Sequence, residues 1–563
     1  MYLRTTKRRN ADGSEVHYYQ LAENRWDAAR GCAVAKVVYS FGRADEVDGE
    51  ALRRLAASIL RVVGDDVAQG DVGEQSDLRV REAWPYGGVY VLEQLWRELG
   101  IDRVVREHAK SKRTAQAFER ALFAMVGNRA LSPYSKLYCW EQWLEHEVFL
   151  PSAQPLELHH LYLAMDFLED HKTEIEKSIY FAMADLMNAD VDVIFYDTTS
   201  LHFEIDEEDA GTVQRKGQKY EPQRKRGHSK NGRGDAPQIV VGLAITRDGL
   251  PVRSWVFSGE TSDVTTVAKV KEDLRGWRLG RCVFVGDAGM NSEDNRRTLA
   301  LGNGKYILAS RMRAGDEVTT EVLTRAGRYQ QVRDNLRVKE VTVGDGERRQ
   351  RYVVCHNPSE QERQRKHREH VVAELELELG SLEQRKGKRH SKRACELRTS
   401  ARFGKYLRET STGKLLIDRG AIADAQRYDG KWVITTNDDT LSAEDLALGY
   451  KQLLRVEQCW RQLKSGLRMR PVFHHRPWRI HAHVTISVLA LLLERIAEIR
   501  AGDTWRNVCA QLERVKVVEY DRGEVRVQQT TQLTPEIENM LRALKVPPPP
   551  KLHAVAAAPV ADA

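Results

Sequence analysis

Several features that mark common classes of protein are missing from this 563-residue sequence. There is no CxxC pair, and the seven cysteines are scattered and odd in number, which argues against a disulfide framework or zinc ribbon and favours a reducing cytoplasm. The N-terminus is basic and polar, unlike a secretory signal. The longest apolar run, Val484–Leu493, is too short to span a bilayer, so we expect a buried helix and no membrane partner.

A strong excess of one charge is also missing. The formal net charge is +7, which suits a nucleic-acid-binding protein and an ordinary slightly basic enzyme equally well. Hydrophobic residues make up 41% of the chain, enough for a substantial core. The length indicates three or four structural units.

Changes in hydrophobic period divide the N-terminal third of the chain. Residues 1–75 are expected to form a β-hairpin unit and a linker, with a helical pattern over residues 50–63. Residues 76–188 carry apolar residues at helical spacing and are expected to be an all-α, DNA-binding domain. Within it, Arg129–Trp143 fits either a helix-turn-helix or a plain helical bundle.

The rest of the chain is predicted to be α/β. Residues 189–310 run strand, strand, strand, helix, strand, helix, strand and, with residues 431–500, predict a ribonuclease-H-like mixed sheet. Residues 311–430 are expected to be a β-rich and helical insertion. A C-terminal helical region over 501–545 and a disordered, Pro/Ala-rich tail over 546–563 complete the expected organisation.

Two aspartates follow apolar strand patterns. Asp197 ends VIFYD and Asp287 follows VFVG, and either residue alone would usually be a turn or cap residue. In a ribonuclease-H-like sheet, however, the first and fourth strands are central neighbours, which would place the two carboxylates side by side. Two such carboxylates repel each other unless a cation lies between them, and oxygen ligands favour magnesium.

A third acid is expected from a helix packed on this sheet. Tyr450, Glu457 and Lys464 are seven residues apart each way and would share one helix face, which Arg461 joins. A carboxylate flanked by Lys and Arg suits a site that holds both a metal and a DNA phosphate. A solvated amphipathic helix is the ordinary alternative.

Taken together, these motifs resemble the bacterial insertion-sequence DDE transposases, over roughly residues 85–500. The similarity is to the subgroup with a Tyr–Arg–Glu–Lys helix signature, and it includes the flanking segments ending in GETSD and beginning with RMRPVFHH. Two positions depart from the pattern, Leu453 in place of the signature Arg and Glu260 in place of a frequent Asn. The resemblance also implies an inserted β-rich domain between the second and third acids, and hairpin-ended excision.

The expected function is cut-and-paste DNA transposition, by metal-dependent cleavage at the element ends and strand transfer into target DNA. Two magnesium ions, about 3.5–4 Å apart and replaceable by manganese, would be held by Asp197, Asp287 and Glu457. The expected partners are double-stranded DNA, as terminal inverted repeats and target, and a second copy of the chain in a synaptic complex. The residues expected to bind phosphate are Tyr450, Arg461, Lys464, Arg224, Lys225 and Lys230.

Other interpretations share some of these features. A ribonuclease-H-like nuclease that cuts without joining would have the same acids, and an inactive transposase-derived protein would still bind DNA. The basic stretch over residues 385–408 could contact DNA or a second subunit. Zinc binding is a weaker interpretation of four histidines, because no cysteine accompanies them. These histidines are His474, His475, His481 and His483.

Overall fold

The fold is that of a computed structural model with two compact units, one of residues 1–79 with 521–524 and one of residues 80–520 with 525–563. The structure describes residues 2–9, 15–27, 32–44, 47, 78–109, 111–187, 192–230, 232–277, 279, 282–312, 316–346, 349–384 and 387–557.

The N-terminal unit contains an antiparallel sheet in the order β1-β2-β3. Its strands are β1 (Tyr2–Arg9), β2 (Glu15–Asp27) and β3 (Cys32–Arg43). The expected hairpin therefore carries a third strand. The helix expected over residues 50–63 lies outside the described residues.

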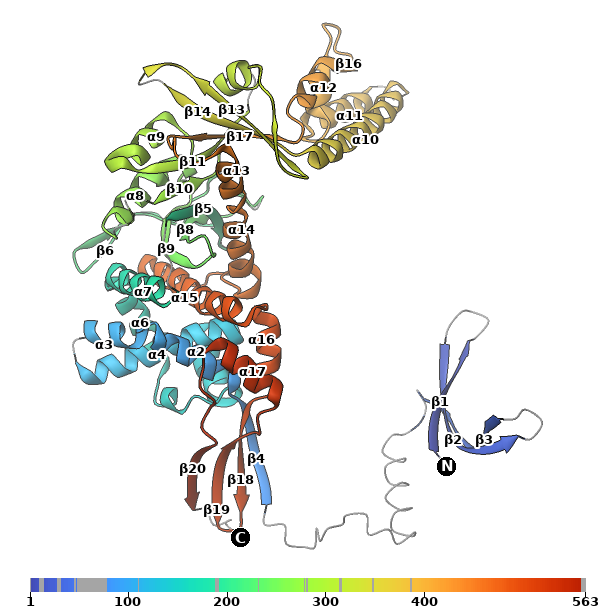
Figure 1. The fold of residues 1–563 in the computed structure, drawn as a ribbon, viewed down its shortest axis with the longest axis vertical. Helices are drawn as coiled ribbons and strands as arrows, with labels where there is room; N and C mark the ends of the chain where they lie inside the picture. Colours follow the sequence, from blue (N-terminus) through green and yellow to red (C-terminus); the bar gives the residue numbers. More distant parts are fainter. Residues whose placement is uncertain are drawn as a thin grey trace. The chain divides into compact units, whose positions relative to one another are not determined.

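The larger unit begins with a group of helices, drawn in blue and cyan in Figure 1. They are α2 (Gly87–Glu98), α3 (Ile101–His108), α4 (Lys112–Leu131), α5 (Lys136–Tyr138), the π-helical η1 (Cys139–Glu147), α6 (Leu158–Asp170) and α7 (Lys172–Leu186). Arg129 and Trp143 are both buried, and the Arg129 guanidinium donates to the carbonyl oxygens of Leu467 and Arg468, at 3.2 and 3.0 Å. Both ends of the segment Arg129–Trp143 are thus packed into the helical group, whereas Tyr134 and Leu137 between them are each 47% exposed.

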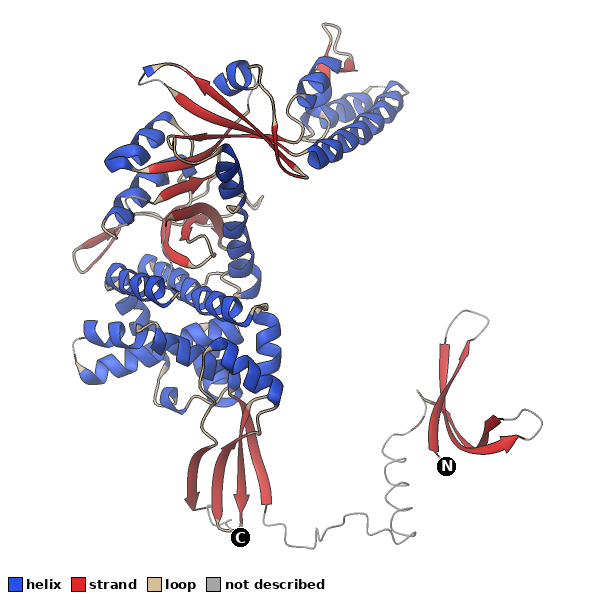
Figure 2. Cartoon of the chain, viewed as in Figure 1, coloured by secondary structure: helices blue, strands red, loops and turns tan. Residues whose placement is uncertain are grey.

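Nine strands form one mixed central sheet, in the order β12-β13-β14-β17-β11-β10-β5-β8-β9. Strands are drawn in red in Figure 2, and most strands of this sheet are labelled in Figure 1. The neighbours β5, β10 and β11 are parallel, and the other pairs are antiparallel. The first strand thus lies beside the fourth, as the ribonuclease-H-like order requires. Six of the strands are β5 (Val193–His202), β8 (Gln238–Ile245), β9 (Pro251–Ser258), β10 (Val283–Gly286), β11 (Lys305–Ser310) and β17 (Lys431–Thr436).

The segment between β11 and β17 extends this same sheet from the β17 side. The alternation EVTTEVLTRAG over residues 317–327 predicts a strand, and this prediction is wrong, because Val318–Val322 forms a π-helical turn whose two buried valines are four residues apart, a helical spacing. The segment comprises β12 (Gln330–Arg333), β13 (Leu336–Val343), β14 (Gln350–His356), α10 (Pro358–Glu383), α11 (Lys388–Thr399), β15 (Leu407–Glu409), β16 (Leu415–Ile417) and α12 (Arg419–Gln426).

Helix α15 (Pro477–Ala501) packs between the sheet and the N-terminal helices, contacting β9, α4 and α6. By length and composition alone it could cross a membrane, but its most apolar window is 89% buried inside the protein, as in a core helix. The sequence expectation of a buried helix here is met.

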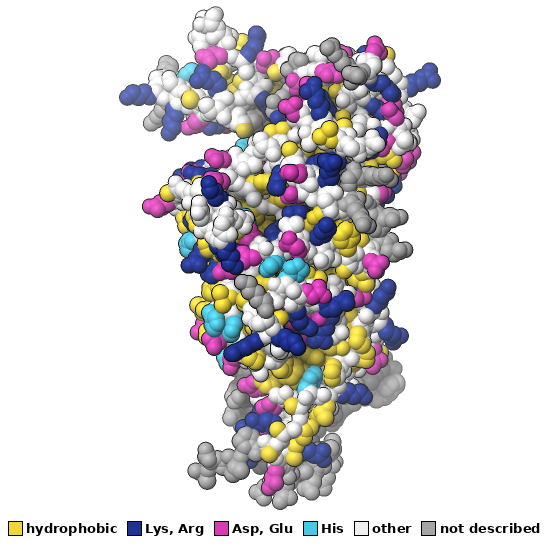
Figure 3. All heavy atoms as spheres, turned by 90° about the vertical axis from the view of Figure 1, so that its left-hand side faces the viewer, with side chains coloured by type: hydrophobic (Ala, Val, Ile, Leu, Met, Phe, Trp, Pro, Cys, Tyr) yellow, Lys and Arg dark blue, Asp and Glu magenta, His cyan; other side chains and the backbone are white. Residues whose placement is uncertain are grey.

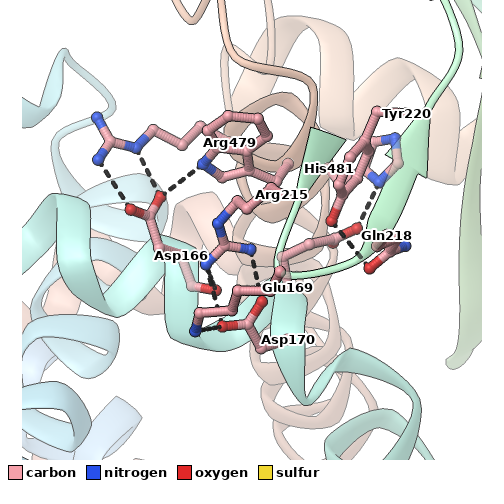
Figure 4. Close-up of polar contacts among 10 residues, drawn as sticks. Asp166, Glu169, Asp170, Arg215, Gln218, Tyr220, Arg479 and His481 are labelled. Atoms are coloured by element: carbon pink, nitrogen blue, oxygen red, sulfur yellow. Dashed lines mark hydrogen bonds and ion pairs between the residues drawn. The ribbon is translucent and has the colours of Figure 1, made fainter. Parts of the chain in front are cut away.

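A short hairpin between β5 and β8 is tied to α6 by an ion pair, and a second ion pair ties α6 to α15 (Figure 4). Arg215 donates to both carboxylate oxygens of Asp170, and Arg479 donates to both oxygens of Asp166. In this cluster each guanidinium meets a carboxylate, so the cluster anchors the hairpin. The hairpin strands are β6 (Val213–Arg215) and β7 (Gln218–Tyr220).

Two expectations for the C-terminal region are wrong. Residues 501–545 are not purely helical, because a β-hairpin separates α16 from α17. The tail is not disordered over residues 552–557, because these residues form β20, whose backbone pairs with β19; residues 558–563 lie outside the described part. The elements are α16 (Trp505–Leu512), α17 (Pro535–Leu544) and the sheet of β20 (Leu552–Ala557), β19 (Val525–Thr530), β18 (Lys516–Arg522) and β4 (Leu78–Pro85).

Candidate active site

Asp197 and Asp287 stand on the two central parallel strands. Strand β5 pairs with β10 through Val193–Phe195, and Asp197 lies two residues beyond that ladder. Asp287 follows β10 directly. The sequence pattern had placed Asp197 at the end of its strand. Strand β5 continues to His202 by pairing with β8, however, so Asp197 lies within the strand. Both carboxylates open into one cleft.

Glu457 reaches the same cleft from α14 (Leu454–Arg461), which packs against β5 and β8. The cleft is open and has a volume of about 670 Å³. Its lining therefore combines all three predicted acids with several basic side chains. The lining residues are Asp197, Thr198, Thr199, His228, Lys230, Asp263, Asp287, Ala288, Gly289, Arg311, Glu457, Trp460, Arg461 and Lys464.

The helix expected over residues 441–467 is broken before the third acid. Helix α13 (Ala443–Lys451) ends, α14 begins at Leu454, and a π-helical turn, Gln462–Gly466, follows. Leu453 lies at the break and is only 9% exposed. The position at which the signature carries Arg therefore faces the core, where a guanidinium could not reach a phosphate.

Because of this break, Tyr450 does not line the cleft with Glu457 and Lys464. Its phenol still lies near the acids. Burial, followed by the charges of Asp287, Glu457 and Asp197, raises the pKa of Tyr450, so this residue stays a neutral hydroxyl behind the carboxylates.

A fourth carboxylate, Asp263, was not predicted from the sequence. It is the first residue of α8 (Asp263–Arg275), and the hydroxyl of Thr198 donates to it. A Cβ atom on Gly289 would lie 3.0 Å from Asp287 Oδ1 and 3.2 Å from Asp263 Oδ2, so these two carboxylates converge on the same glycine. An acid in the first turn of a helix is usually explained by its favourable interaction with the helix dipole, so this position by itself was no reason to place Asp263 among the other acids. The GETSD motif was the available signal.

Lys230 lies among these acids. Its Nζ is 2.9 Å from Asp263 Oδ2 and 3.8 Å from Asp197 Oδ1. The same ammonium donates to the carbonyl oxygen of Thr198 at 2.8 Å and to its hydroxyl oxygen at 2.7 Å. The backbone N–H of Lys230 donates to Ser200 Oγ at 3.0 Å. Lys230 is thus bound along the edge of β5, within the cleft.

The basic, Gly-rich composition before Lys230 is typical of a mobile loop. In the structure, however, backbone contacts hold this stretch in place. Lys225 and Gln238 exchange two backbone hydrogen bonds, and the Gln238 amide donates to the carbonyl oxygen of Gly259 at 2.9 Å. A Cβ atom on Gly259 would lie 2.1 Å from the carbonyl oxygens of both Lys225 and Gln238. Glycine is required there because two backbone segments pass against it.

Two of the predicted phosphate-binding residues are occupied elsewhere. Arg224 Nε donates to Asp209 Oδ1 at 2.7 Å, and Lys225 Nζ lies 3.2 Å from Glu208 Oε2. Neither Arg224 nor Lys225 lines the cleft. Their contacts support a structural role in fixing the stretch that carries Lys230.

Arg461 and Lys464 do line the cleft, on the turns after Glu457. The pKa of Lys464 is lowered to about 8. Burial is the main cause, the charge of Arg470 adds to the fall, and the charge of Asp197 opposes it. Lys464 therefore lies within electrostatic reach of both Asp197 and Arg470. Added negative charge from a phosphate would favour its charged form.

The crowded acids create a need for positive charge. The pKa of Asp197 is raised to about 6. Burial is the main cause, the charge of Lys230 opposes the rise, and the charges of Asp287 and Asp263 add to it. Oxygen donors that repel one another suit a hard divalent cation. Among the described residues, no three His, Cys, Asp or Glu side chains form a ready-made metal cluster. The donor set thus fits such a cation, and the acids would have to move closer together to surround one.

The four histidines considered for zinc do not form a cluster in the described part of the chain. His481 Nδ1 lies 2.6 Å from Glu169 Oε1, in the contact network of Figure 4. His483 is buried, and its Nε2 lies 2.9 Å from the carbonyl oxygen of Met469. These contacts account for His481 and for Nε2 of His483 without a metal.

Charge on the molecular surface is mixed. On the face drawn in Figure 3, described Lys and Arg side chains lie among Asp and Glu side chains. Recognition of an anion therefore depends on local groups such as those of the cleft.

Comparisons with known proteins give two family matches. The family described as "Transposase DDE domain" matches residues 197–493, a span that begins at Asp197 and includes Asp287 and Glu457. "IS1634 family transposase, N-terminal domain" matches residues 3–70. No curated protein matches the chain. Among solved structures, the cryo-EM structure of the piggyBac transposase synaptic complex with hairpin DNA covers 76% of this chain and 78% of its own, at 9% identity and a TM-score of 0.35, too low to carry an argument.

Proposed function

The chain belongs to the DDE transposase family, and on that premise we propose that Asp197, Asp287 and Glu457 are its catalytic carboxylates. The observation that carries the proposal is the shared cleft, into which β5, the end of β10 and α14 each deliver one acid. The proposed reaction is cleavage at the ends of a mobile element followed by strand transfer of the free 3′-OH into target DNA.

Divalent metal ions are general in this family, and we propose magnesium, as two ions, with manganese able to substitute. Asp197, Asp287 and Glu457 would hold them. When bound, such ions activate the attacking oxygen and stabilise charge on the leaving 3′ oxygen. The raised pKa of Asp197 supports this proposal: burial is its main cause, and the charges of Asp287 and Asp263, which a cation would offset, add to it.

The remaining cleft residues would position the DNA. Arg461, Lys464 and Arg311 line the cleft and can neutralise phosphate near the scissile bond. Lys230 can contact phosphate only by loosening its contact with Asp263. Tyr450 would support the acids from behind. Positioning and neutralisation are the protein's main contributions to phosphoryl transfer.

DNA is the partner that the family implies. We propose that the protein binds its terminal inverted repeats and a target duplex, and that two copies pair in a synaptic complex. The proposed place of action is the bacterial cytoplasm.

The test uses the full chain, magnesium and duplexes taken from the DNA that flanks its gene. Asp197→Asn, Asp287→Asn and Glu457→Gln should each lower cleavage by about a thousandfold or more while DNA affinity stays within a few-fold of wild type. Asp294→Asn is a matched control, because Asp294 is 94% exposed on α9 (Glu293–Ala300). Full cleavage by any of the three variants would remove that residue from the proposal. Cleavage by the wild type without a joined product would favour a nuclease.

A further inference from the structure

A second cavity, of about 480 Å³, lies between the N-terminal helices and the segment that follows the catalytic helix. Its walls come from the turn after α4, from α5 and from the residues preceding α15. Its volume falls within the range of roughly 300–1,000 Å³ that is usual for small-ligand sites. None of the residues assigned to catalysis lines it. We name it the α4–α15 pocket.

Positive charge gathers in the α4–α15 pocket without a counter-charge. Arg129, Lys136, Arg468 and Arg470 line it, and no Asp or Glu is among its described lining residues. This differs from the neighbouring cluster of Figure 4, in which each guanidinium meets a carboxylate. A concave site with several cations and no acid attracts an anion.

Lys136 is the least explained of these groups. It is only 5% exposed, and among the described residues its ammonium has no hydrogen-bond or ion-pair partner. The pKa of Lys136 is lowered to about 7, mainly by burial and in part by the charge of Arg129. A buried ammonium without a partner is costly, so its presence calls for a ligand that compensates the charge.

The histidines of the pocket repeat this pattern. Burial, together with the charges of Lys136 and Arg129, lowers the pKa of His474 to about 3 and that of His483 well below its usual value. His483 Nδ1 is buried without a hydrogen-bond partner in the described structure. Arg129 Nε is likewise buried without a partner, so the pocket contains two such atoms besides the Lys136 ammonium.

Aromatic rings make up much of the remaining wall. Tyr134 and Tyr162 line the pocket, and the guanidinium of Arg468 lies over the Tyr134 ring, 5.5 Å from its centroid. Phe473 also lines the pocket and is 69% exposed. Exposed aromatic rings beside cations are suited to stacking on a nucleic-acid base next to a bound phosphate.

The pocket is close to the catalytic cleft. Arg470 lines the pocket and also lowers the pKa of Lys464, which lines the cleft. Only six positions along the chain separate these two cations. A single DNA strand gripped at Lys464 can therefore continue toward Arg470.

We propose that the α4–α15 pocket binds one nucleotide of the DNA substrate, with its phosphate on Lys136, Arg468 and Arg470 and its base against Tyr134 and Tyr162. The inference rests on the proposed function for the identity of the anion as DNA. It gives the segment Arg129–Tyr138 a DNA contact that does not require a recognition helix in a groove.

The test compares Lys136→Met with wild type in the full chain. Removing an unpartnered buried ammonium should leave thermal stability unchanged or raise it. Affinity for flanking-DNA duplexes should fall about tenfold at moderate salt, and the slope of log K against log salt should become shallower by about one. Lys271→Met is the matched control, a half-buried lysine of α8 outside the pocket whose pKa is also lowered by burial; it should bind DNA as wild type does.

Single methylphosphonate substitutions along the duplex locate the contact. One neutralised position should weaken binding by the wild type and have no further effect on Lys136→Met. Arg468→Gln, at an exposed residue, should show the same loss at the same position, and it remains informative if Lys136→Met fails to fold. If both variants bind DNA with the affinity and the salt slope of the wild type, the proposal that the α4–α15 pocket binds DNA is wrong. A wild-type chain that binds none of these duplexes would instead overturn the proposed function.

Discussion

The ammonium of Lys230 lies 2.9 Å from Asp263 Oδ2, inside the cleft that also contains the three predicted catalytic acids. Asp263 thereby holds a side-chain cation 3.8 Å from Asp197 Oδ1. The pair places an internal positive charge where a divalent ion would relieve the same repulsion. Lys230 and a metal ion are therefore expected to compete for the carboxylates.

Asp263→Asn should weaken metal binding without unfolding the protein. The change removes one carboxylate and frees Lys230 to pair more closely with Asp197. The expected result is about a tenfold rise in the Mn²⁺ concentration needed for half-maximal thermal stabilisation of the DNA-free protein. Lys230→Met in the same background should recover part of the loss, because the competing ammonium is gone. An unchanged Mn²⁺ titration for Asp263→Asn would show that Asp263 has no part in the metal site.

Asp197 should make stability depend on pH in the presence of a chelator. Its pKa is about 6 in the folded chain and about 3.9 in an unfolded one, so the folded state binds the proton more tightly between these values. The free energy of unfolding should therefore fall as pH rises from about 4 to about 6. Asp197→Asn lacks this loss and should be more stable than wild type above pH 6, by at most about 3 kcal/mol, and equal below pH 4. Urea unfolding at several pH values measures the difference; a variant less stable than wild type at pH 7.5 would contradict it.

Restoring the family's arginine at the helix break should damage the fold. Leu453 is 9% exposed, so Leu453→Arg would bury a guanidinium in the core and should lower the free energy of unfolding by about 2–4 kcal/mol. Leu454→Arg is the matched control, since the adjacent Leu454 is 53% exposed and should tolerate the change within about 0.5 kcal/mol. Equal stability of the two variants in urea would mean that position 453 is open to solvent.

Gly259→Ala should disturb the support of Lys230. Its Cβ atom would overlap the carbonyl oxygens of Lys225 and Gln238, both at 2.1 Å, so the basic stretch must move away from β8. A loss of about 1–3 kcal/mol in the free energy of unfolding is expected, together with weaker cleavage. A Cβ atom on Gly234 meets nothing within 4 Å, so Gly234→Ala should match wild type in both measurements. Wild-type stability of Gly259→Ala would show that this crossing of the backbones is loose.

Local sequence patterns predicted the five strands β5, β8, β9, β10 and β11 of the central sheet and the place of two acids in it. Strands such as β5 and β10 are short, buried and rich in β-branched residues, so local pattern is enough to find them, and their order predicted that Asp197 and Asp287 lie on neighbouring strands. Glu457 was predicted from its spacing to Tyr450 and Lys464. The relation to Lys464 holds in the structure, because both residues lie after the helix break and line the same cleft. Periodicity finds such features because each depends on residues close in the sequence.

The partners of the acids depend on contacts between segments that lie far apart in the sequence. Asp263 and Lys230 are 33 positions apart and meet through the crossing of the basic stretch with β8 at Gly259. The break at Leu453, the strand β20 in a tail expected to be disordered, and the pocket around Lys136 likewise depend on contacts between distant segments. A local pattern carries no information on such contacts, because burial and backbone pairing are fixed by the segment that arrives from elsewhere in the chain.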